Sequence, residues 1–378
     1  YIEELVTEAI HDRLRVNDPV GFWVGTQLSV INVKDSAGNN VNSIDDDTKR
    51  TIIASDSAGT LTLDSPLPTS VIGQSYEIQT ELSAPIIGIH HLLGIPLNES
   101  LPPINLRLGT TRGTNALLTR TGSKTALVTT VGFKDLLEIG NQNRPKLFEL
   151  NIQKTIPLIT TSIEISERID THGNILQSID RDQVRLQLAR LFAEGIESLA
   201  ICLLNSFVNP EHEQVIAEIA NEFPFASVSI SSRVSPLIKM VPRADTTVLD
   251  AYLNPVLNAY LKQLRAALHV DSNVRLLTSA GGLIPADQFS GKDSILSGPA
   301  GGVVGFSHAA KRAGYTRAIG FDMGGTSTDV SRFGGTYDYE YETEKSGVRI
   351  VTPMMAIETV AAGGGSICGF DGIKLTVG

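Results

Sequence analysis

The stretch Gly320-Phe321-Asp322-Met323-Gly324-Gly325-Thr326-Ser327-Thr328-Asp329-Val330-Ser331 decides how this sequence is interpreted. An apolar strand beginning near Thr316 delivers an aspartate to its end, two glycines permit a tight turn, and a return strand rich in hydroxyl groups follows. Glycine lets backbone N–H groups approach phosphate oxygens, and Thr and Ser hydroxyls add donors. The stretch therefore predicts a phosphate-binding hairpin, and the alternative is an ordinary β-hairpin with a glycine turn.

The polar residues of this hairpin are predicted to fill two roles. Asp322 suits holding Mg²⁺, directly or through water, or orienting the attacking water, and Asp329 is the second candidate catalytic carboxylate. The hairpin is not a Walker loop, because no Gly-Lys-Ser/Thr follows the glycines. The candidate contacts to a nucleotide's phosphates are Gly324, Gly325, Thr326, Ser327 and Thr328.

Two further glycine-rich stretches lie on either side of the hairpin. The downstream stretch permits close approach of the backbone either to a nucleotide or to a neighbouring element, and the upstream one, residues 297–305, leads into a helix that holds His308. Small residues at that helix start serve either tight packing or anion binding, and the sequence does not separate these. The downstream candidate contacts to the nucleotide are Gly363, Gly364, Gly365 and Ser366.

Side chains suited to a small polar ligand occur in two earlier segments. Residues 108–117 set hydroxyls, an amide and an arginine between apolar runs, and residues 138–145 are again dense in hydrogen-bonding groups. The arginine of the second segment suits bidentate recognition of a carboxylate. A solvated loop is the alternative interpretation. The candidate substrate contacts are Thr110, Thr111, Thr114, Asn115, Asn141 and Arg144.

The histidines and cysteines offer no comparable pattern. The seven histidines, including the adjacent His90 and His91, form no HExxH or HxH arrangement. Cys202 lies inside an apolar strand, and Cys368 follows a glycine loop without an evident base beside it. Nucleophilic cysteine catalysis and a histidine metal site are therefore disfavoured.

Composition and charge narrow the classes of protein. A hydrophobic share of 42% and a charged share of 19% are typical of a compact globular protein. The net charge of -10 disfavours nucleic acid and anionic lipid as partners. The two distant cysteines argue against a disulfide scaffold and a structural zinc site, which favours a reducing, cytoplasmic setting. No window reaches the ~18 apolar residues of a membrane span, and we predict no signal peptide.

The sequence predicts three parts. Residues 1–84 are predicted to form a lead-in helix and a small β module, residues 85–315 a central α/β domain, and residues 316–378 the start of a second subdomain that carries the hairpin. The lead-in helix is assigned to residues 1–16, where acidic and apolar residues recur at roughly helical spacing. The β module, from Gly21 to about Thr80, consists of short alternating runs separated by turn residues, with a hairpin at residues 36–40.

The central domain alternates strands and helices. Residues 124–130 and 198–204 are buried-strand candidates, each followed by a helix, at residues 134–138 and 210–221. A long helix is predicted for residues 246–268, because leucines recur there at spacings of three and four. Its leucine stripe is predicted to face the core rather than a cofactor.

Taken together and in order, these motifs resemble the hydantoinase A/5-oxoprolinase family. The resemblance runs from about Ser83 to Gly378, and its most specific marks are GTTRGTNALLTRTG, GFKDLLEIGNQNRP, ILSGPAGGVVG, GFDMGGTSTDVS and ETVAAGGGSI. It implies an actin-like or Hsp70-like (ribonuclease H-like) ATPase fold with mixed sheets, and ATP and Mg²⁺ in an interdomain cleft. Asp322 through Asp329 would be the second phosphate hairpin of that fold.

The sequence departs from the family pattern in one respect that matters for activity. The family's first phosphate hairpin, an Asp-x-Gly-Gly-Thr pattern, is not found in these 378 residues, and the chain is expected to be a piece that lacks both ends. The resemblance therefore implies that the chain by itself binds ATP feebly and turns over little.

The resemblance also implies a reaction and its partners. ATP would phosphorylate the amide oxygen of a five-membered lactam or imide, and water would then attack the activated carbon. Residues 140–148 look closer to the oxoprolinase members, which favours 5-oxoproline as substrate and glutamate as product. An N-methylhydantoinase, an acetone carboxylase-type subunit, and an actin/Hsp70-like nucleotide-dependent switch are the alternatives. We expect a hydantoinase B-like subunit or domain as partner, a homo-oligomer, and neither nucleic acid nor membrane.

Overall fold

The structure is a computed structural model in which contacts divide the chain into two compact units, Tyr1–Asn105 with Leu261–Asn273, and Leu106–Tyr260 with Val274–Gly378. The described residues are 4–5, 13–15, 19–32, 43–56, 60–68, 71, 75–141, 148, 150–152, 154–325 and 327–377, and side chains are described for all of these except 4, 5, 13–15, 32 and 43–46. The division into residues 1–84, 85–315 and 316–378 stays a prediction.

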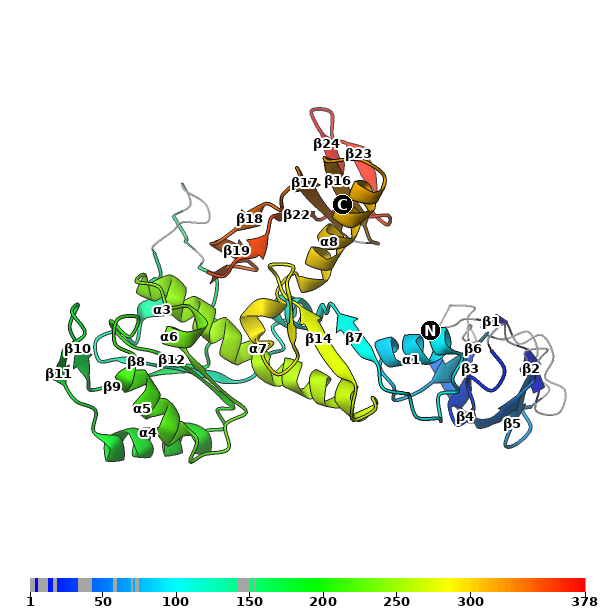
Figure 1. Ribbon diagram of the computed structural model, residues 1–378, viewed down its shortest axis with the longest axis horizontal. Helices are drawn as coiled ribbons and strands as arrows, with labels where there is room; N and C mark the ends of the chain where they lie inside the picture. Colours follow the sequence, from blue (N-terminus) through cyan, green and yellow to red (C-terminus); the bar gives the residue numbers. More distant parts are fainter. Residues whose placement is uncertain are drawn as a thin grey trace. The chain divides into compact units, whose positions relative to one another are not determined.

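The first unit is built on a six-stranded antiparallel sheet (Figure 1). Its strands, in spatial order, are β1 (Glu4–Leu5), β6 (Ser75–Gln79), β3 (Gln27–Asn32), β4 (Ser43–Ser55), β5 (Thr60–Leu63) and β2 (Arg13–Arg15). Alternate residues of the strands point inward, so that Leu28, Val30 and Tyr76 are fully buried. Helix α1 (Ala84–Leu93) follows and ends at Gly94, whose φ of 66° is the left-handed cap that glycine favours.

The lead-in helix predicted for residues 1–16 is wrong where the structure describes it. β1 pairs with β6 and β2 pairs with β5, both antiparallel. Pairing at the two edges of an existing sheet overrides a weak helical periodicity, because backbone groups gain ladder partners there. The predicted strands of the β module are found. β3 and β4 pair on either side of residues 33–42, so the predicted turn at residues 36–40 lies outside the described residues.

The second unit contains a parallel four-stranded sheet that confirms the predicted buried strands. In spatial order its strands are β13 (Ser227–Ile230), β12 (Ser198–Cys202), β8 (Thr125–Thr130) and β9 (Thr161–Ile165). Every residue of β8 and β12 is buried, as expected for parallel strands covered on both faces. Helices near this sheet are α3 (Leu136–Ile139), α4 (Arg181–Ala193), α5 (Glu211–Ala220) and α6 (Ser231–Val234).

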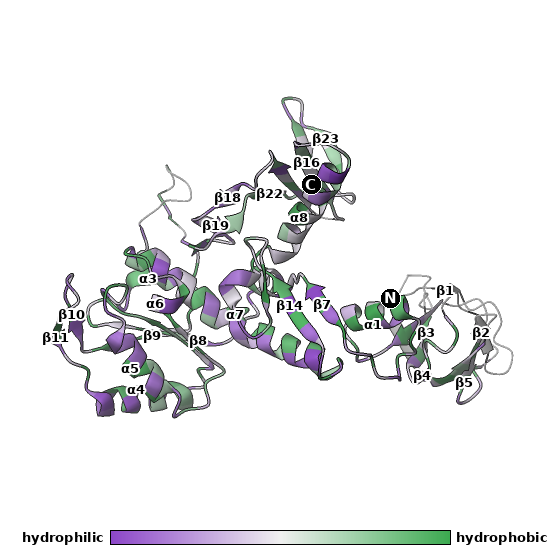
Figure 2. Cartoon of the chain, viewed as in Figure 1, coloured by the Kyte–Doolittle hydropathy of each residue, from purple (hydrophilic) through white to green (hydrophobic). Residues whose placement is uncertain are grey.

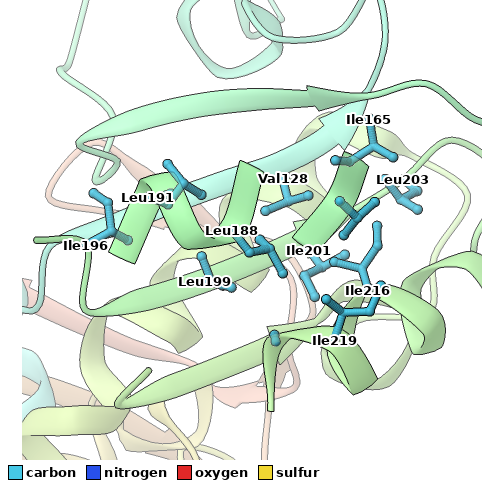
Figure 3. Packing of buried hydrophobic residues seen from close by; sticks show 13 residues of the cluster. Val128, Ile165, Leu188, Leu191, Ile196, Leu199, Ile201, Leu203, Ile216 and Ile219 are labelled. Atoms are coloured by element: carbon cyan, nitrogen blue, oxygen red, sulfur yellow. The ribbon is translucent and has the colours of Figure 1, made fainter. Parts of the chain in front are cut away.

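The core of this sheet is a cluster of branched aliphatic side chains (Figure 3). Helix α4 begins at Asp180, whose carboxylate accepts the backbone N–H groups of Asp182 and Gln183 at 3.0 and 3.1 Å. From that fixed start, α4 directs Leu188 onto the sheet, where it is fully buried. The labelled members of the cluster are Val128, Ile165, Leu188, Leu191, Ile196, Leu199, Ile201, Leu203, Ile216 and Ile219.

The long predicted helix is confirmed as α7 (Met240–Ala266), which begins six residues before the predicted start. The Thr246 and Thr247 hydroxyls donate to carbonyls four residues earlier, at 2.8 and 2.7 Å, so both hydroxyls are satisfied within the helix. The leucine stripe is core, as predicted: its buried members are Leu249, Leu253, Leu257, Leu261 and Leu264.

A second sheet contains, in spatial order, β15 (Leu283–Pro285), β14 (Asn273–Leu277) and β7 (Asn105–Leu108). A third sheet contains β16 (Ala318–Met323), β17 (Thr328–Phe333) and β22 (Ile357–Val360). Helix α8 (Ser297–Arg312) packs on the third sheet. The glycine-rich residues 297–305 belong to this helix rather than to a loop before it. A Cβ on Gly320 of β16 would lie 2.3 Å from the Phe306 ring, so this strand glycine is what allows α8 to approach the sheet. Further elements are α2 (Arg112–Leu118), η2 (Gly291–Ser294), β10 (Arg168–Ile169), β11 (Ile175–Gln177), β18 (Tyr339–Glu340), β19 (Thr343–Lys345), β20 (Val348–Ile350), β21 (Met354–Met355), β23 (Cys368–Phe370) and β24 (Leu375–Val377).

Most helices carry both polar and apolar residues (Figure 2). Among the described residues, no helix has both the length and the apolar character that crossing a bilayer requires.

Truncation of a single core leucine tests the packing of the parallel sheet. We expect Leu188→Ala to lower the free energy of unfolding by about 2 to 5 kcal/mol, because it leaves a cavity in a fully buried cluster. Leu186→Ala, on the same helix but with a side chain 72% exposed, should change it by less than about 0.5 kcal/mol. Urea unfolding followed by circular dichroism measures both, and equal losses would contradict the packing described.

Candidate functional site

The predicted phosphate hairpin is formed by β16 and β17. Asp322 lies directly opposite Asp329 in the antiparallel register, so both side chains point to the same face of the sheet. The turn is closed by the Gly324 N–H, which donates to the Ser327 carbonyl at 2.9 Å. Thr326, a predicted nucleotide contact, lies outside the described residues.

The two glycine stretches that are distant in the sequence lie side by side. The Gly364 N–H donates to the Gly324 carbonyl, and the Gly365 N–H donates to the Gly325 carbonyl, each at 2.9 Å. A Cβ on Gly365 would lie 3.2 Å from the Gly325 oxygen, which is tighter than ordinary contact. Gly365 is therefore the position of this contact at which a side chain would be crowded.

Three predicted hydroxyl positions have different surroundings. Thr328 is buried and donates to the Ala362 carbonyl at 2.6 Å, so its hydroxyl holds the glycine segment against the hairpin. The Ser366 hydroxyl accepts the Gly363 N–H at 3.0 Å and shapes the same turn. Ser327 is partly exposed beside the hairpin turn. Ser327 and Ser366 are thus both half-buried, and Thr328 is the buried member of the three.

A cavity of about 250 Å³ lies between α8 and the sheet face that carries the two aspartates. Asp329 accepts the Thr359 hydroxyl at 2.7 Å, and Asp322 is exposed. Two carboxylates opposite each other on neighbouring strands repel, which a cation between them would relieve. The cavity is lined by Pro299, Gly302, Val303, Phe306, Gly320, Phe321, Asp322, Asp329, Ser331 and Ile357.

The donor set at this cavity fits Mg²⁺ better than a metal held entirely by protein. Among the residues that the structure describes, no three His, Cys, Asp or Glu side chains group in a way that could hold a metal ion. Mg²⁺ is commonly bound through one or two carboxylates and completed by water and phosphate oxygens. Asp322 and Asp329 would supply the carboxylates, and the ion would neutralise charge on a bound phosphate.

The predicted substrate residues around Thr110 lie at the beginning of α8. The Ser297 hydroxyl donates to the Thr110 carbonyl at 2.8 Å, and the Thr114 hydroxyl accepts the Leu296 N–H at 3.0 Å. Thr110 is buried, whereas Thr111 and Asn115 are exposed. The Thr110 hydroxyl accepts the Arg112 N–H at 3.2 Å, so the hydroxyls of Thr110 and Thr114 both have partners within the protein. Thr111 and Asn115 are the members of this group open to solvent.

Asn141 lies elsewhere, in a cleft of about 340 Å³ within the second unit. The lining does not include Thr110, Thr111, Thr114 or Asn115, so the two predicted substrate segments do not share this cleft. Arg144 lies outside the described residues. The cleft is lined by Leu137, Glu138, Ile139, Gly140, Asn141, Lys154, Thr155, Ile156, Pro157, Leu158, Asp245, Val248, Glu344, Gly347, Val348 and Arg349.

Two charged residues of this cleft were not singled out from the sequence. Asp245 on α7 and Arg349 on β20 approach to 3.7 Å, and their side chains are 22% and 15% exposed. Burial raises the pKa of Asp245 to about 7, although Arg349 lowers it, and Glu344 raises it further. A carboxyl with a pKa near neutrality in a cleft is typical of functional sites. The available signal was an aspartate beside the buried face of a long helix.

The carboxyl ends of the parallel strands hold a buried polar cluster instead of a ligand site. His212 contacts Glu167 at 2.6 Å, and Glu213 accepts the Leu203 N–H and the Ser231 hydroxyl at 2.9 and 2.6 Å. Buried charges with such partners are satisfied by the protein itself. Cys202 is buried beside this cluster, and burial raises its thiol pKa, so the prediction that Cys202 is inert fits its surroundings.

Comparison with known proteins identifies the family. The model of the hydantoinase/oxoprolinase N-terminal region matches residues 68–223, and the hydantoinase/oxoprolinase model matches residues 243–378. The chain belongs to the hydantoinase/oxoprolinase family. The resemblance inferred from the five sequence marks is therefore confirmed.

Relatives in this family are much longer than the chain. A 5-oxoprolinase from Saccharomyces cerevisiae is 42% identical over 335 residues, which cover 78% of this chain and 26% of that protein. The acetophenone carboxylase gamma subunit from Aromatoleum aromaticum is 32% identical over 313 residues, or 76% of this chain and 42% of that protein. The chain thus spans about a quarter of the length of the first of these relatives.

Solved structures support the architecture. The crystal structure of an ATP-dependent caprolactamase from Pseudomonas jessenii superposes with a TM-score of 0.66 at 26% identity, covering 86% of this chain and 48% of that one. The chain accordingly has a mixed α/β architecture with several sheets, which confirms the predicted α/β class.

The raised pKa of Asp245 predicts how stability depends on pH. A folded pKa near 7, above the ordinary value of 3.8, means that the folded protein binds a proton that the unfolded chain releases. Stability from this group is therefore present below pH 4 and is lost as the pH rises to about 7. Asp245→Asn should remove that slope, which amounts to a few kcal/mol at most. Urea midpoints at several pH values measure it, and an unchanged slope in the variant would contradict the assignment.

Proposed function

We propose that this chain forms part of the ATP site of an enzyme that opens a cyclic amide, with 5-oxoproline to glutamate as the favoured reaction. The hairpin and the glycine segment at residues 363–366 would bind the nucleotide's phosphates within an actin-like or Hsp70-like ATPase fold. The observation that carries the proposal is the pair of hydrogen bonds that joins Gly364 and Gly365 to Gly324 and Gly325 beside two aspartates. Membership of the hydantoinase/oxoprolinase family supports it.

The residues would divide the work as their positions suggest. Asp322 and Asp329 would hold Mg²⁺, which would neutralise charge on the transferred phosphoryl group when bound. The N–H groups of Gly324, Gly363, Gly364 and Gly365 donate within the protein, so the Gly325 N–H and the Ser327 hydroxyl would contact the phosphate oxygens. Neither role depends on a covalent bond between enzyme and substrate, so positioning and electrostatics would supply most of the rate.

ATP is needed in this reaction because an unstrained amide is a poor electrophile. The amide oxygen would attack the γ-phosphorus, and the bond between that phosphorus and the ADP oxygen would break. Water would then add to the activated carbon, and the ring C–N bond would break as the nitrogen takes up a proton. Opening the ring and releasing inorganic phosphate together consume two water molecules, so that the products are glutamate, ADP and phosphate.

A carboxylase-type subunit is the second candidate. The similarity to an acetophenone carboxylase gamma subunit favours it, and the two candidates differ in whether a ring amide or a ketone is activated. A hydantoinase B-like partner and a homo-oligomer fit either candidate, and both are proposals.

Substitution of the paired aspartates tests the nucleotide site. We expect Asp322→Asn to weaken Mg²⁺-ATP binding by about 10- to 100-fold, because one of two carboxylate ligands is lost. The control is Asp338→Asn, which removes only a surface partner of Arg332. Calorimetric titration with Mg²⁺ and a non-hydrolysable ATP analogue measures both, on the longest polypeptide that carries this chain. Equal affinities for the Asp322 variant and the unmodified protein would refute the assignment.

Substitution of Gly365 tests the contact on which the proposal depends. Gly365→Ala places a Cβ 3.2 Å from the Gly325 oxygen, so the glycine segment must shift away from the hairpin. We expect nucleotide affinity to fall about fivefold or more. Gly334→Ala is the matched control, because its Cβ would meet open space. An effect of the same size in both variants would show that the contact has no special role.

A further inference from the structure

The cleft around Asn141 has the size of a small-molecule site. Its buried apolar residues are Leu137, Leu158, Val248 and Val348, each less than one tenth exposed. Asp245 and Arg349 are the half-buried polar groups among them. The rest of the lining is largely polar, and the volume of about 340 Å³ lies within the usual range of ligand pockets.

Arg349 is held next to Asp245 by its own hairpin. The Val351 N–H donates to the Thr246 hydroxyl at 2.9 Å, which attaches the end of β20 to α7 one residue from Asp245. The turn between β19 and β20 packs so closely that a Cβ on Gly347 would lie 2.3 Å from the Thr155 hydroxyl. The two charged groups are therefore pre-positioned by backbone contacts on both sides.

The side chains of Asp245 and Arg349 have hydrogen-bonding groups that are not used within the protein. The Arg349 guanidinium lies 3.7 Å from Asp245 and 3.6 Å from Glu342, and both distances exceed a hydrogen bond. Among the described residues, no hydrogen bond of the guanidinium is found. The pair thus presents an acceptor and a donor side by side, both available to a ligand.

The charges at the mouth of the cleft do not replace this pair. Glu138, Lys154 and Glu344 are exposed, and the Lys154 ammonium donates to the Glu138 and Ile139 carbonyls at 3.0 and 3.1 Å. Exposed charges are well screened by water, whereas the half-buried pair is not. Recognition of a ligand inside the cleft therefore falls to Asp245 and Arg349.

A lactam ring has the matching pattern of hydrogen-bonding groups. Ring closure forces its amide into the cis form, so N–H and C=O point to the same side, whereas open-chain secondary amides are trans and point them in opposite directions. We propose that Asp245 and Arg349 recognise the cis-amide edge of a lactam or hydantoin ring, with the carboxylate accepting the ring N–H and the guanidinium donating to the ring carbonyl. This inference rests on the proposed function and assigns the residues that recognise the ring.

The proposed recognition excludes two other classes of ligand. An open-chain amide satisfies only one of the two partners, and a ketone has no N–H for Asp245. The carbonyl oxygen keeps a second lone pair when Arg349 uses the first, so the atom that ATP would phosphorylate stays available. The ring methylenes would contact the apolar lining.

Ligand titration separates these classes. We expect 2-pyrrolidinone and 5-oxoproline to bind about tenfold or more tightly than N-methylacetamide or cyclopentanone, measured by calorimetry or ligand-observed NMR without nucleotide. Arg349→Gln and Asp245→Leu should each weaken lactam binding by about tenfold or more. Arg190→Gln, on an arginine paired with Glu194 at the surface, should leave it unchanged.

Several results would contradict recognition of the ring by Asp245 and Arg349. Equal affinity for 2-pyrrolidinone and N-methylacetamide, no lactam binding, or full binding by the Arg349 variant would each overturn it. If a single substitution unfolds the protein by leaving one buried charge, Asp245→Leu with Arg349→Met removes both charges at similar volume and should still abolish the lactam preference. ATP-dependent glutamate formation is measured separately, on the longest polypeptide that carries this chain. Lactam binding without glutamate formation there refutes the proposed function alone, and glutamate formation that persists in the Arg349 variant refutes this inference alone.

Discussion

The candidate nucleotide site depends on one backbone interaction, the two hydrogen bonds from the Gly364 and Gly365 amides to the carbonyls of Gly324 and Gly325. These bonds join segments about forty residues apart and fix the spacing of two glycine-rich backbones. A side chain at Gly365 would crowd the Gly325 carbonyl, so the contact is most sensitive to substitution at that position. The Thr328 hydroxyl strengthens the same junction by donating to Ala362.

The buried carboxylates and the cavity-facing carboxylates differ in how their charge is compensated. Glu167 and Glu213 are fully buried, and each has short contacts to a histidine, a hydroxyl or a backbone amide. Asp322 and Asp329 lie opposite one another on neighbouring strands, and Asp329 accepts the Thr359 hydroxyl. The fully buried carboxylates are thus compensated by several partners within the chain, whereas the proposed Mg²⁺ would compensate the hairpin pair.

The sequence predicted those strands and helices whose formation depends on the residue pattern within the element itself. The buried strands β8 and β12 follow from continuous apolar runs, and the leucine stripe of α7 follows from its spacing. The helix predicted for residues 1–16 was wrong in its described part because sheet pairing, a long-range effect, decided it. The Asp245–Arg349 pair was missed for a similar reason: its partners are about a hundred residues apart, and the raised pKa arises from burial that only the fold creates.

The short turn at Ser346 and Gly347 has a consequence for how this family could diversify. Both residues have positive φ, 53° and 74°, which is the two-residue hairpin geometry that fixes strand register. Because side chains alternate between faces, adding or removing one residue here would rotate position 349 out of the cleft. The phosphate hairpin belongs to a different sheet and would keep its geometry. The residues proposed for ring recognition and those proposed for nucleotide binding therefore lie on separately mutable parts of one chain.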